Sequence, residues 1–390
     1  MCRLMSNESW NILMVVLSTV APDVRVEKEA RYLVNEGHNV TIIATNPQSN
    51  LPKEEERDGY TILRVPIRKK LFFKYFEFWK QVRKIVDKKQ YDIIHLHDLN
   101  VLPLASKLSK NCKILIYDSH ENFPEQMSET FGFPALWVYT LLEKYYINKV
   151  HGIITAATTV TNTLKRKYKK ESIWVSNYPS KIDVEEAHES EIADEFSKKK
   201  KFRIVHFGVM YSNLGYYQTV EAVEKLKSEL KPSEIEFLVM GSGPALEPMK
   251  KMIEDRNLTQ YFNVTGWMNY LEALSILRTC DIGLILLQPG KNNYLRMPNR
   301  LYDYCSAGVP FIGSDFEGLQ RAKKKAGDIG YLIDATSPDE IASVILSLCK
   351  DQEELDKMKN AAKQSYLTKF NWEAEASKLI EKYKETFQNL

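Results

Sequence analysis

The sequence predicts an α/β protein built from two doubly wound parallel sheets in tandem. Short continuous apolar runs alternate with amphipathic stretches of helical spacing, which is typical of buried parallel strands joined by helices. The series breaks once, in a charged stretch at 181–200, and then begins again. The chain has 390 residues. That is long enough for two domains, because single hydrophobic cores stop growing at about 250–300 residues.

The first domain is expected over residues 1–180. Its first strand is "NILMVVL" (11–17), followed by a helical pattern that ends at Gly37 and by a second strand, "NVTIIAT". The later strands are "YDIIHLHD" (91–98), "KILIYDS" (113–119) and "GIITAA" (152–157). Strands separated by helices pair in parallel, so these runs predict one parallel sheet.

The second domain is expected over residues 201–369. The charged stretch 181–200, "KIDVEEAHESEIADEFSKKK", has few apolar residues and is interpreted as a linker. The predicted strands that follow it are 202–208, 235–243, 261–266, 281–287 and 309–314. Residues 370–390 are predicted to form an amphipathic helix that crosses back to the first domain.

Composition excludes several classes of protein. Hydrophobic residues make up 44% of the chain and charged residues 27%, as in ordinary soluble domains. The five cysteines are scattered and form no CxxC pair, which favours a reducing compartment over a disulfide framework or a zinc site. The first apolar run is too short for a membrane span and lacks the features of a signal peptide, so a cytoplasmic protein is expected.

Residues 64–89 are unusually basic and aromatic. This segment contains ten Lys and Arg, two acids and six aromatic residues, and "LKRKYKK" at 164–170 adds a second basic cluster. Such a segment can lie on an anionic membrane surface, or its aromatic residues can pack into their own domain. Nucleic-acid binding is not expected, because no stacking motif accompanies the charge.

Residues 297–312, "MPNRLYDYCSAGVPFI", predict a short helix between two strands of the second domain. A proline suits its first turn and a glycine suits its end. The amino terminus of a helix favours phosphate, and Arg300 adds a permanent charge with paired donors. Asp303, one turn later, is an acceptor suited to two neighbouring hydroxyl groups such as those of ribose. The alternative is that Arg300 and Asp303 pair with each other.

Two glycines, Gly241 and Gly243, follow a predicted strand of the second domain in "MGSGP". Glycine permits a close approach of the backbone to a ligand, but a tight turn between strand and helix explains the pair equally well.

Histidines follow two predicted strands of the first domain. His95 and His97 are expected to point to opposite faces of the sheet, so the pair is not expected to share a metal ion. His120 and Glu121 lie just past a strand end, where a polar side chain can reach a ligand.

Taken together, these residues resemble the family-4 glycosyltransferases of the GT-B fold, which has two Rossmann-like domains facing a cleft. The resemblance covers nearly the whole chain and is most specific in the 297–312 segment. It implies transfer of a sugar from a nucleoside-diphosphate donor, a nucleotide sugar, with retention of anomeric configuration. It also implies that no metal ion and no other cofactor is required.

The resemblance also assigns roles to individual residues. Donor diphosphate would be bound at Gly208 and at Asn299 and Arg300, and ribose at Asp303. His120 matches a histidine near the donor sugar, with Glu121 as its neighbour, and both are the predicted catalytic residues. Independently of the resemblance, Trp267 and Met268 lie just after a predicted strand end, so contact with the base through their backbone groups is expected.

Three positions depart from the family pattern. Leu295 stands where the first of two glutamates is usual, and Val209 and Leu214 stand where the family has a diphosphate-binding arginine and lysine. Other cations would have to replace them. The candidates are Arg25, Lys291, Arg296 and Arg300.

The hypothesis is a hexosyltransferase of polysaccharide biosynthesis at the inner face of the cell membrane. Its acceptor would be lipid-linked or a growing glycan. One alternative is a catalytically weakened partner that binds a nucleotide sugar, which Val209 and Leu214 favour. Another is a nucleotide-sugar epimerase, which needs acids and bases on both faces of the sugar, with Asp98, Glu121 and Glu317 as the nearby candidates.

Overall fold

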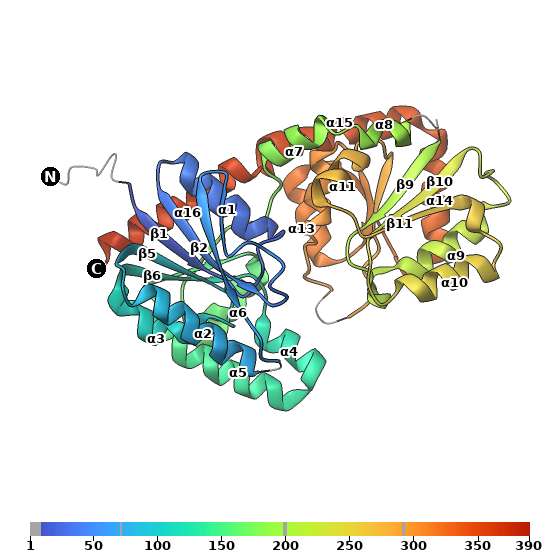
Figure 1. The fold of residues 1–390 in the computed structure, drawn as a ribbon. Helices are drawn as coiled ribbons and strands as arrows, with labels where there is room; N and C mark the ends of the chain where they lie inside the picture. Colours follow the sequence, from blue (N-terminus) through green and yellow to red (C-terminus); the bar gives the residue numbers. More distant parts are fainter. Residues whose placement is uncertain (1–8, 71, 198–200, 291–292) are drawn as a thin grey trace. The chain divides into compact units, whose positions relative to one another are not determined.

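The computed structural model describes residues 9–390 apart from 71, 198–200 and 291–292. The chain divides into two compact units (Figure 1). Met1–Asn177 and Glu373–Leu390 form the first, and Tyr178–Trp372 form the second. Each has its own sheet and hydrophobic core. None of the helices formed by the described residues is both long and apolar enough to cross a bilayer.

The first unit contains an eight-stranded sheet in the order β3-β4-β2-β1-β5-β6-β7-β8. All neighbouring strands are parallel except β3 and β4. The strands are β1 (Asn11–Val15), β2 (Asn39–Asn46), β3 (Glu54–Arg57), β4 (Tyr60–Pro66), β5 (Tyr91–His97), β6 (Cys112–Ser119), β7 (Gly152–Thr155) and β8 (Ile173–Trp174).

Helices cover both faces of this sheet. They are α1 (Val24–Asn35), α2 (Phe73–Val86), α3 (Ala105–Leu108), α4 (Phe123–Phe131), α5 (Phe133–Tyr146), α6 (Thr158–Tyr168) and the carboxyl-terminal α16 (Trp372–Gln388). α2 buries Phe78, Val82 and Val86, which recur every fourth residue and so form one apolar stripe. The alternation of Ile94 and Leu96 with His95 and His97 along β5 sends the aliphatic side chains into the α2 core and the histidines to the opposite face.

α16 belongs to the first unit although it ends the chain. The Tyr383 hydroxyl lies 2.7 Å from His95 Nδ1, and the Glu375 carboxylate accepts a hydrogen bond of 2.9 Å from the Ser176 backbone N–H. The helix therefore completes the core of the unit that the first 177 residues form.

The second unit contains a six-stranded, fully parallel sheet in the order β11-β10-β9-β12-β13-β14. The strands are β9 (Phe202–Phe207), β10 (Ile235–Met240), β11 (Phe262–Gly266), β12 (Ile282–Ile285), β13 (Phe311–Ser314) and β14 (Gly330–Ile333). The helices are α7 (Lys181–His188), α8 (Ile192–Ser197), α9 (Tyr216–Leu226), α10 (Leu246–Asp255), α11 (Tyr270–Leu277), α12 (Arg300–Ser306), α13 (Glu317–Ala326), α14 (Pro338–Lys350) and α15 (Gln352–Lys369).

The structure corrects the predicted linker at 181–200. Its described part forms α7 and α8, which pack against α11 inside the second unit, while 198–200 lie outside the described residues. The Ser180 side chain caps α7 by accepting a hydrogen bond from the Asp183 N–H, and Val184 and Phe196 pack on the core. Each of these short helices has only one or two apolar residues in contact with the core. The two helices were therefore not recognisable in a sequence that is mostly charged. The boundary between the units lies at Asn177 and Tyr178.

Candidate active site

The order of the strands indicates where a ligand of the second sheet would bind. From β9 the chain proceeds outward through β10 to β11, and then returns to the other side of β9 for β12, β13 and β14. The connections after β9 and β12 therefore diverge at their carboxyl ends. Ligands of doubly wound sheets bind at this switch point. The loop after β9 contains Gly208 and Val209, and the segment after β12 leads to Arg300.

Arg300 lies at this switch point with no carboxylate partner. A β-carbon built on Gly208 would be 3.8 Å from Arg300 Cζ, so the guanidinium lies against the backbone of the β9 loop. Among the ion pairs of the described ranges, none involves Arg300. The alternative in which Arg300 pairs with Asp303 is therefore not what the structure shows. A half-buried guanidinium without an anion is suited to phosphate.

Neutral groups surround the Arg300 guanidinium. Tyr216 stacks on His206 with ring centroids 3.8 Å apart, and its hydroxyl donates to the carbonyl oxygens of Gly208 and Val209. Burial raises the pKa of Tyr216 against the opposing effect of Arg300, and burial together with Arg300 holds the pKa of His206 well below its usual value. Both rings are therefore uncharged at neutral pH. Tyr216 is not predictable from the sequence, because an aromatic residue at a helix start belongs to no known motif.

Asp303 is buried and hydrogen-bonded within the second unit. Its Oδ1 accepts a bond of 2.8 Å from the Tyr270 hydroxyl. Burial and the adjacent Asp303 raise the pKa of Tyr270 well above its usual value, so this hydroxyl remains a donor. The partner orients the carboxylate on α12. Binding of ribose by Asp303 stays a prediction.

The two glycines after β10 serve backbone packing. Gly241 has φ +148, and a β-carbon there would lie 1.9 Å from the carbonyl oxygen of Gly208. At Gly243 the nearest atom would be the Met210 carbonyl oxygen at 2.5 Å. Backbone hydrogen bonds from Gly208 to Met240 and from Met210 to Ser242 join the same two loops. The tight-turn explanation of these glycines is thus the one that the structure supports, and their loop holds Gly208 in place.

The positions that lack the family's cations differ in their environment. Val209 is 55% exposed, whereas Leu214 is buried in the core of the unit. Leu295 and Arg296 are exposed in the segment before α12, and Lys291 lies outside the described residues. A cationic side chain at position 209 would stay outside the core. A cationic side chain at position 214 would be buried in it.

The remaining predicted donor contacts lie at strand and helix ends of the same unit. Trp267 and Met268 follow β11, with the Trp267 ring largely exposed, and the Gly266 carbonyl next to them accepts a hydrogen bond from the Gly241 N–H. Asn299 precedes α12 and is exposed, and its side chain makes no cap hydrogen bond. Their predicted roles in binding base and diphosphate stay predictions.

The structure corrects the prediction that Arg25 binds the diphosphate. The side chain is buried in the first unit and donates to both oxygens of Asp118, at 2.9 to 3.1 Å, and to the Val175 carbonyl oxygen. Its Nη2 also lies 3.1 Å from Glu29. Burial opposes the charged form, but the two carboxylates raise the pKa of Arg25. The guanidinium is committed to these partners, so it is not available to a diphosphate.

The expected orientation of His95 and His97 is also wrong. Successive side chains of a strand alternate, so residues two apart share a face. The two imidazole rings stack with centroids 4.3 Å apart. His97 is the register partner of Asp118 on β6, and its Nδ1 lies 3.6 Å from the Asp118 carboxylate.

Among the described residues of the first unit, this buried group brings possible metal ligands close together. Glu29, His95, His97 and Asp118 each offer an atom within 4.8 Å of the others. However, Arg25 already compensates both carboxylates, which removes much of the attraction for a second cation. Burial holds the pKa of His95 well below its usual value, so this ring is neutral. We therefore interpret the group as a buried charge network, and the absence of a metal requirement stays a prediction.

His120 lies at the edge of this network and is positively charged at neutral pH. Its Nε2 is 3.2 Å from Asp118 Oδ2 and its Nδ1 is 3.4 Å from Asp98 Oδ2. Burial opposes the charged form, but Asp98 and Asp118 raise the pKa of His120 to about 9. An imidazolium between two carboxylates cannot act as a general base at pH 7, but its charge can act on a developing anion. Glu121, next in the chain, is exposed.

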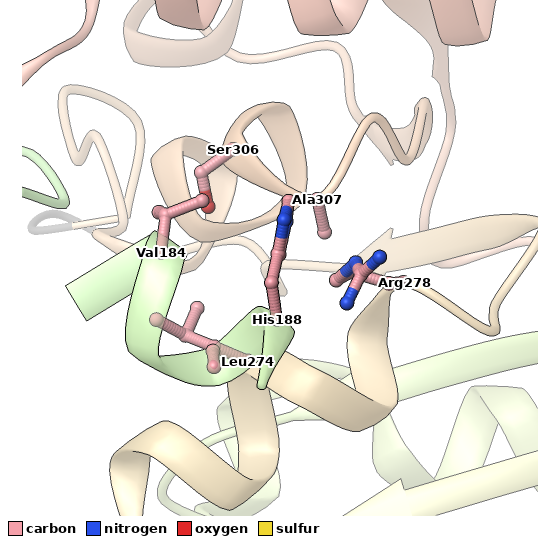
Figure 2. Close-up of a pocket in the computed structure, with 7 residues that line it drawn as sticks. Val184, His188, Leu274, Arg278, Ser306 and Ala307 are labelled. Atoms are coloured by element: carbon pink, nitrogen blue, oxygen red, sulfur yellow. The ribbon is translucent and has the colours of Figure 1, made fainter. Parts of the chain in front are cut away.

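A small pocket in the second unit lies apart from these residues. Figure 2 shows it between α7, α11 and the end of α12, with Val184, His188, Leu274, Arg278, Ser306 and Ala307 around it. Its empty space, open solvent included, is about 160 Å³, less than the several hundred Å³ typical of small-molecule sites. It contains none of the predicted site residues and is not a nucleotide site.

Two family comparisons cover both units. Residues 23–176 match the family described as Glycosyltransferase Family 4, and residues 188–365 match Glycosyl transferases group 1. The chain belongs to the GT-B glycosyltransferases. Among solved structures, this glycosyltransferase-family chain is similar to sucrose-phosphate synthase from Thermosynechococcus elongatus, at 15% identity and a TM-score of 0.79, over 97% of this chain and 99% of that one. It is also similar to Anabaena HepE in complex with UDP-glucose, at 12% identity and a TM-score of 0.72, over 98% and 100%.

The matches to curated relatives cover a smaller part of each chain. The GPI3 subunit of phosphatidylinositol N-acetylglucosaminyltransferase from Saccharomyces cerevisiae is 23% identical over 65% of this chain and 56% of its own length. Alpha-D-kanosaminyltransferase from Streptomyces kanamyceticus is 20% identical over 51% of this chain and 50% of its own. The match thus spans about half the length of these relatives. The predicted fold class and family are confirmed.

Proposed function

We propose that this chain transfers a sugar from a nucleoside-diphosphate donor to a lipid-linked or glycan acceptor with retention of configuration. One observation carries the proposal: the Arg300 guanidinium lies without a carboxylate partner against the Gly208 loop, at the switch point of the second sheet. Phosphate oxygens would supply the missing anion. Membership in the glycosyltransferase family makes the diphosphate of a nucleotide sugar the natural ligand.

The chemistry follows from the charge that develops in the reaction. As the bond between the anomeric carbon and the phosphate oxygen breaks, the sugar becomes cation-like and the diphosphate gains negative charge. Arg300 would stabilise that leaving group, as a preorganised charge does in other transferases. The leaving oxygen itself would accept the proton of the acceptor hydroxyl on the same face of the sugar. No carboxylate base, metal ion or other cofactor is needed in this scheme.

His120 contributes a positive charge in this proposal. Its imidazolium, fixed by Asp98 and Asp118, would interact with negative charge on the reacting sugar and phosphate. Because the pKa is about 9, the charged form predominates at neutral pH. Asp98 and Asp118 are positioning residues in this scheme. Glu121, exposed beside His120, is proposed to contact the substrate.

We further propose that the protein works at the cytoplasmic face of the cell membrane, in contact with the bilayer through 64–89. The GPI3 relative is the subunit of an enzyme named for a phosphatidylinositol acceptor, which supports a lipid-linked acceptor here.

Release of nucleoside diphosphate tests the transfer. UDP, GDP and ADP sugars are incubated with the protein, with and without a membrane lipid extract, and donor affinity is measured separately by calorimetry. The expected result is extract-dependent release that falls about 100- to 1,000-fold in Arg300→Gln, because one stabilising donor is worth roughly 3 to 4 kcal/mol. Arg278→Gln, at an exposed arginine of the same unit beside the small pocket that lies apart from the predicted site residues, is the matched control and is expected to behave as the native protein.

The same assay separates the two alternatives. Tight donor binding with no release under any condition identifies a binding partner of an active transferase, which the hydrophobic Val209 and Leu214 favour. Conversion of the donor into an epimer without an acceptor identifies an epimerase. In either case the transferase proposal is wrong.

A further inference from the structure

α5 exposes an apolar side that its own domain leaves uncovered. The exposed fractions of its large apolar residues range from 36% to 68%. We call this the α5 face, and its members are Phe133, Trp137, Val138, Leu141, Leu142 and Tyr145. Four of them recur at every fourth position, and the other two follow directly after members of that row. They therefore form a continuous stripe along the helix.

The polarity of α5 is inverted relative to an ordinary surface helix. Its one carboxylate, Glu143, lies on the buried side, where it accepts hydrogen bonds from the hydroxyls of Tyr117 and Tyr168. The exposed side is the more hydrophobic of the two. A surface helix in water normally shows the opposite arrangement, and a large exposed apolar patch marks a surface that binds something.

The start of α2 extends this surface. Phe72, Phe73 and Phe76 are exposed there, while the apolar stripe of α2 formed by Phe78, Val82 and Val86 is buried. Burial, and after it the Tyr139 side chain of α5, raises the pKa of Tyr75 of α2, so the two side chains are near each other. Both helices lie on the same side of the first sheet (Figure 1). Of the segment 64–89, only this amino-terminal part of the helix has aromatic residues available to a membrane.

Positive charge borders the exposed aromatic residues. Lys69, Lys74 and Lys149 each place their ammonium group 5.2 to 6.0 Å from the ring centre of Phe73, Tyr75 and Tyr145, respectively. Glu77 of α2 is occupied by the backbone N–H groups of Arg68 and Lys69. Aromatic residues edged by lysines are suited to anionic headgroups above an apolar layer.

We propose that the α5 face, together with Phe72, Phe73 and Phe76, inserts into the interfacial layer of a bilayer that contains anionic lipid. α5 has 14 residues and so extends about 21 Å, less than the roughly 30 Å of a hydrocarbon core, so it lies in the plane of the surface. The inference deepens the proposed action on a lipid-linked acceptor, but it rests on the surface of the first unit alone. It can hold even if the sugar-transfer proposal fails.

Vesicle flotation with the full chain tests the inference. The vesicles contain phosphatidylcholine alone, or phosphatidylcholine with about one third phosphatidylglycerol. The native protein is expected to float with the anionic vesicles, and its binding is expected to weaken as salt increases. The double variant Trp137→Gln/Leu141→Gln is expected to bind about tenfold more weakly, because two inserted side chains are lost.

Two controls keep the result specific. Leu367→Gln removes an exposed apolar side chain of α15, in the second unit, and is expected to bind vesicles as the native protein does. Thermal unfolding shows that the double variant is folded, as expected for substitutions of exposed residues. A native protein that ignores both kinds of vesicle overturns the proposal. So does a native protein that dimerises in solution through residues 137 and 141, because a second copy would then cover the face.

Discussion

The charged side chains proposed for the two units differ in whether they have a counter-charge. Arg25, Asp118 and His120 satisfy one another in the first unit. Arg300 in the second unit lies near the neutral rings of Tyr216 and His206 and the Gly208 backbone, and it forms no ion pair within the described residues. A buried or half-buried charge is costly unless it is paired, so an unpaired guanidinium at a strand end indicates where an anion binds. That contrast is the basis for placing the donor site at Arg300 and not at Arg25.

Restoring the family's cation at position 209 should strengthen donor binding. Val209→Arg adds a guanidinium at an exposed position of the β9 loop, beside the proposed diphosphate. We expect affinity for the nucleoside diphosphate to rise about tenfold, because a hydrogen bond to a charged group contributes about 1.5 kcal/mol. Isothermal titration calorimetry checks this.

Leu214→Lys provides the contrasting variant. Leu214 is buried, so a lysine there is expected to lower the free energy of unfolding by about 3 kcal/mol without improving affinity. Urea unfolding measures the loss. Equal nucleotide affinity in Val209→Arg and the native protein would place the diphosphate elsewhere.

The charge of His120 predicts a pH dependence. Its pKa in the folded protein, about 9, lies above the usual value near 6.5, so the stability that it contributes is fully present below about pH 6.5 and is lost as the pH rises through 9. Nucleotide release should fall over the same upper range as the imidazolium deprotonates. His120→Gln should abolish this limb of the pH–rate profile. A profile that keeps its decline near pH 9 in the variant would assign that limb to another group.

At the scale of elements, the hydrophobic pattern of the sequence predicted some strands and helices and missed others. The apolar runs predicted β1, β2, β5, β6 and β7 of the first sheet and β9 to β13 of the second, because a buried parallel strand must be hydrophobic on both faces. β3, β4, β8 and β14 were not predicted. α7 and α8 did not stand out from their charged sequence, because two short helices need few apolar residues to dock on α11. The loops after β9 and β10 pack so closely that Gly241 and Gly243 have no room for a side chain. In the sequence, these glycines could equally have indicated a close approach to a ligand.

Gly241→Ala tests the role of these loops. The added carbon would lie 1.9 Å from the Gly208 carbonyl oxygen, so the β9 loop must shift. We expect weaker nucleotide binding together with a loss of about 2 kcal/mol or more in the free energy of unfolding. Gly327→Ala is the matched control. It also has a positive φ, but nothing lies within 4 Å of the added carbon, so backbone strain alone should appear and nucleotide affinity should persist.

At the scale of the whole molecule, the chain returns to its first unit to finish it. α16 supplies Tyr383 to His95 and Glu375 to the Ser176 backbone, and Phe387 contacts Trp10 near the start of β1. The first unit is thus discontinuous in sequence, while the second is continuous from Tyr178 to Trp372.

Removal of residues 373–390 should therefore destabilise one unit and spare the other. We expect calorimetry of the truncated chain to show a lowered transition for the first unit, because buried contacts of α16 are lost. The transition of the second unit and its nucleotide affinity should be unchanged. A single transition that shifts as a whole would show that the two units unfold together.

Sequence pattern alone determined the two-sheet α/β architecture, the family and the segment that contains Arg300 and Asp303. These features are local, because hydrophobic periodicity and the spacing of a loop and helix are set by near neighbours along the chain. Tertiary structure decided which charges are satisfied. It paired Arg25 with Asp118, 93 residues away, stacked His95 on His97 and placed Tyr270 beside Asp303. It also left the apolar side of α5 exposed. Burial and electrostatic pairing are properties of residues brought together from distant parts of the chain, and local pattern does not contain them.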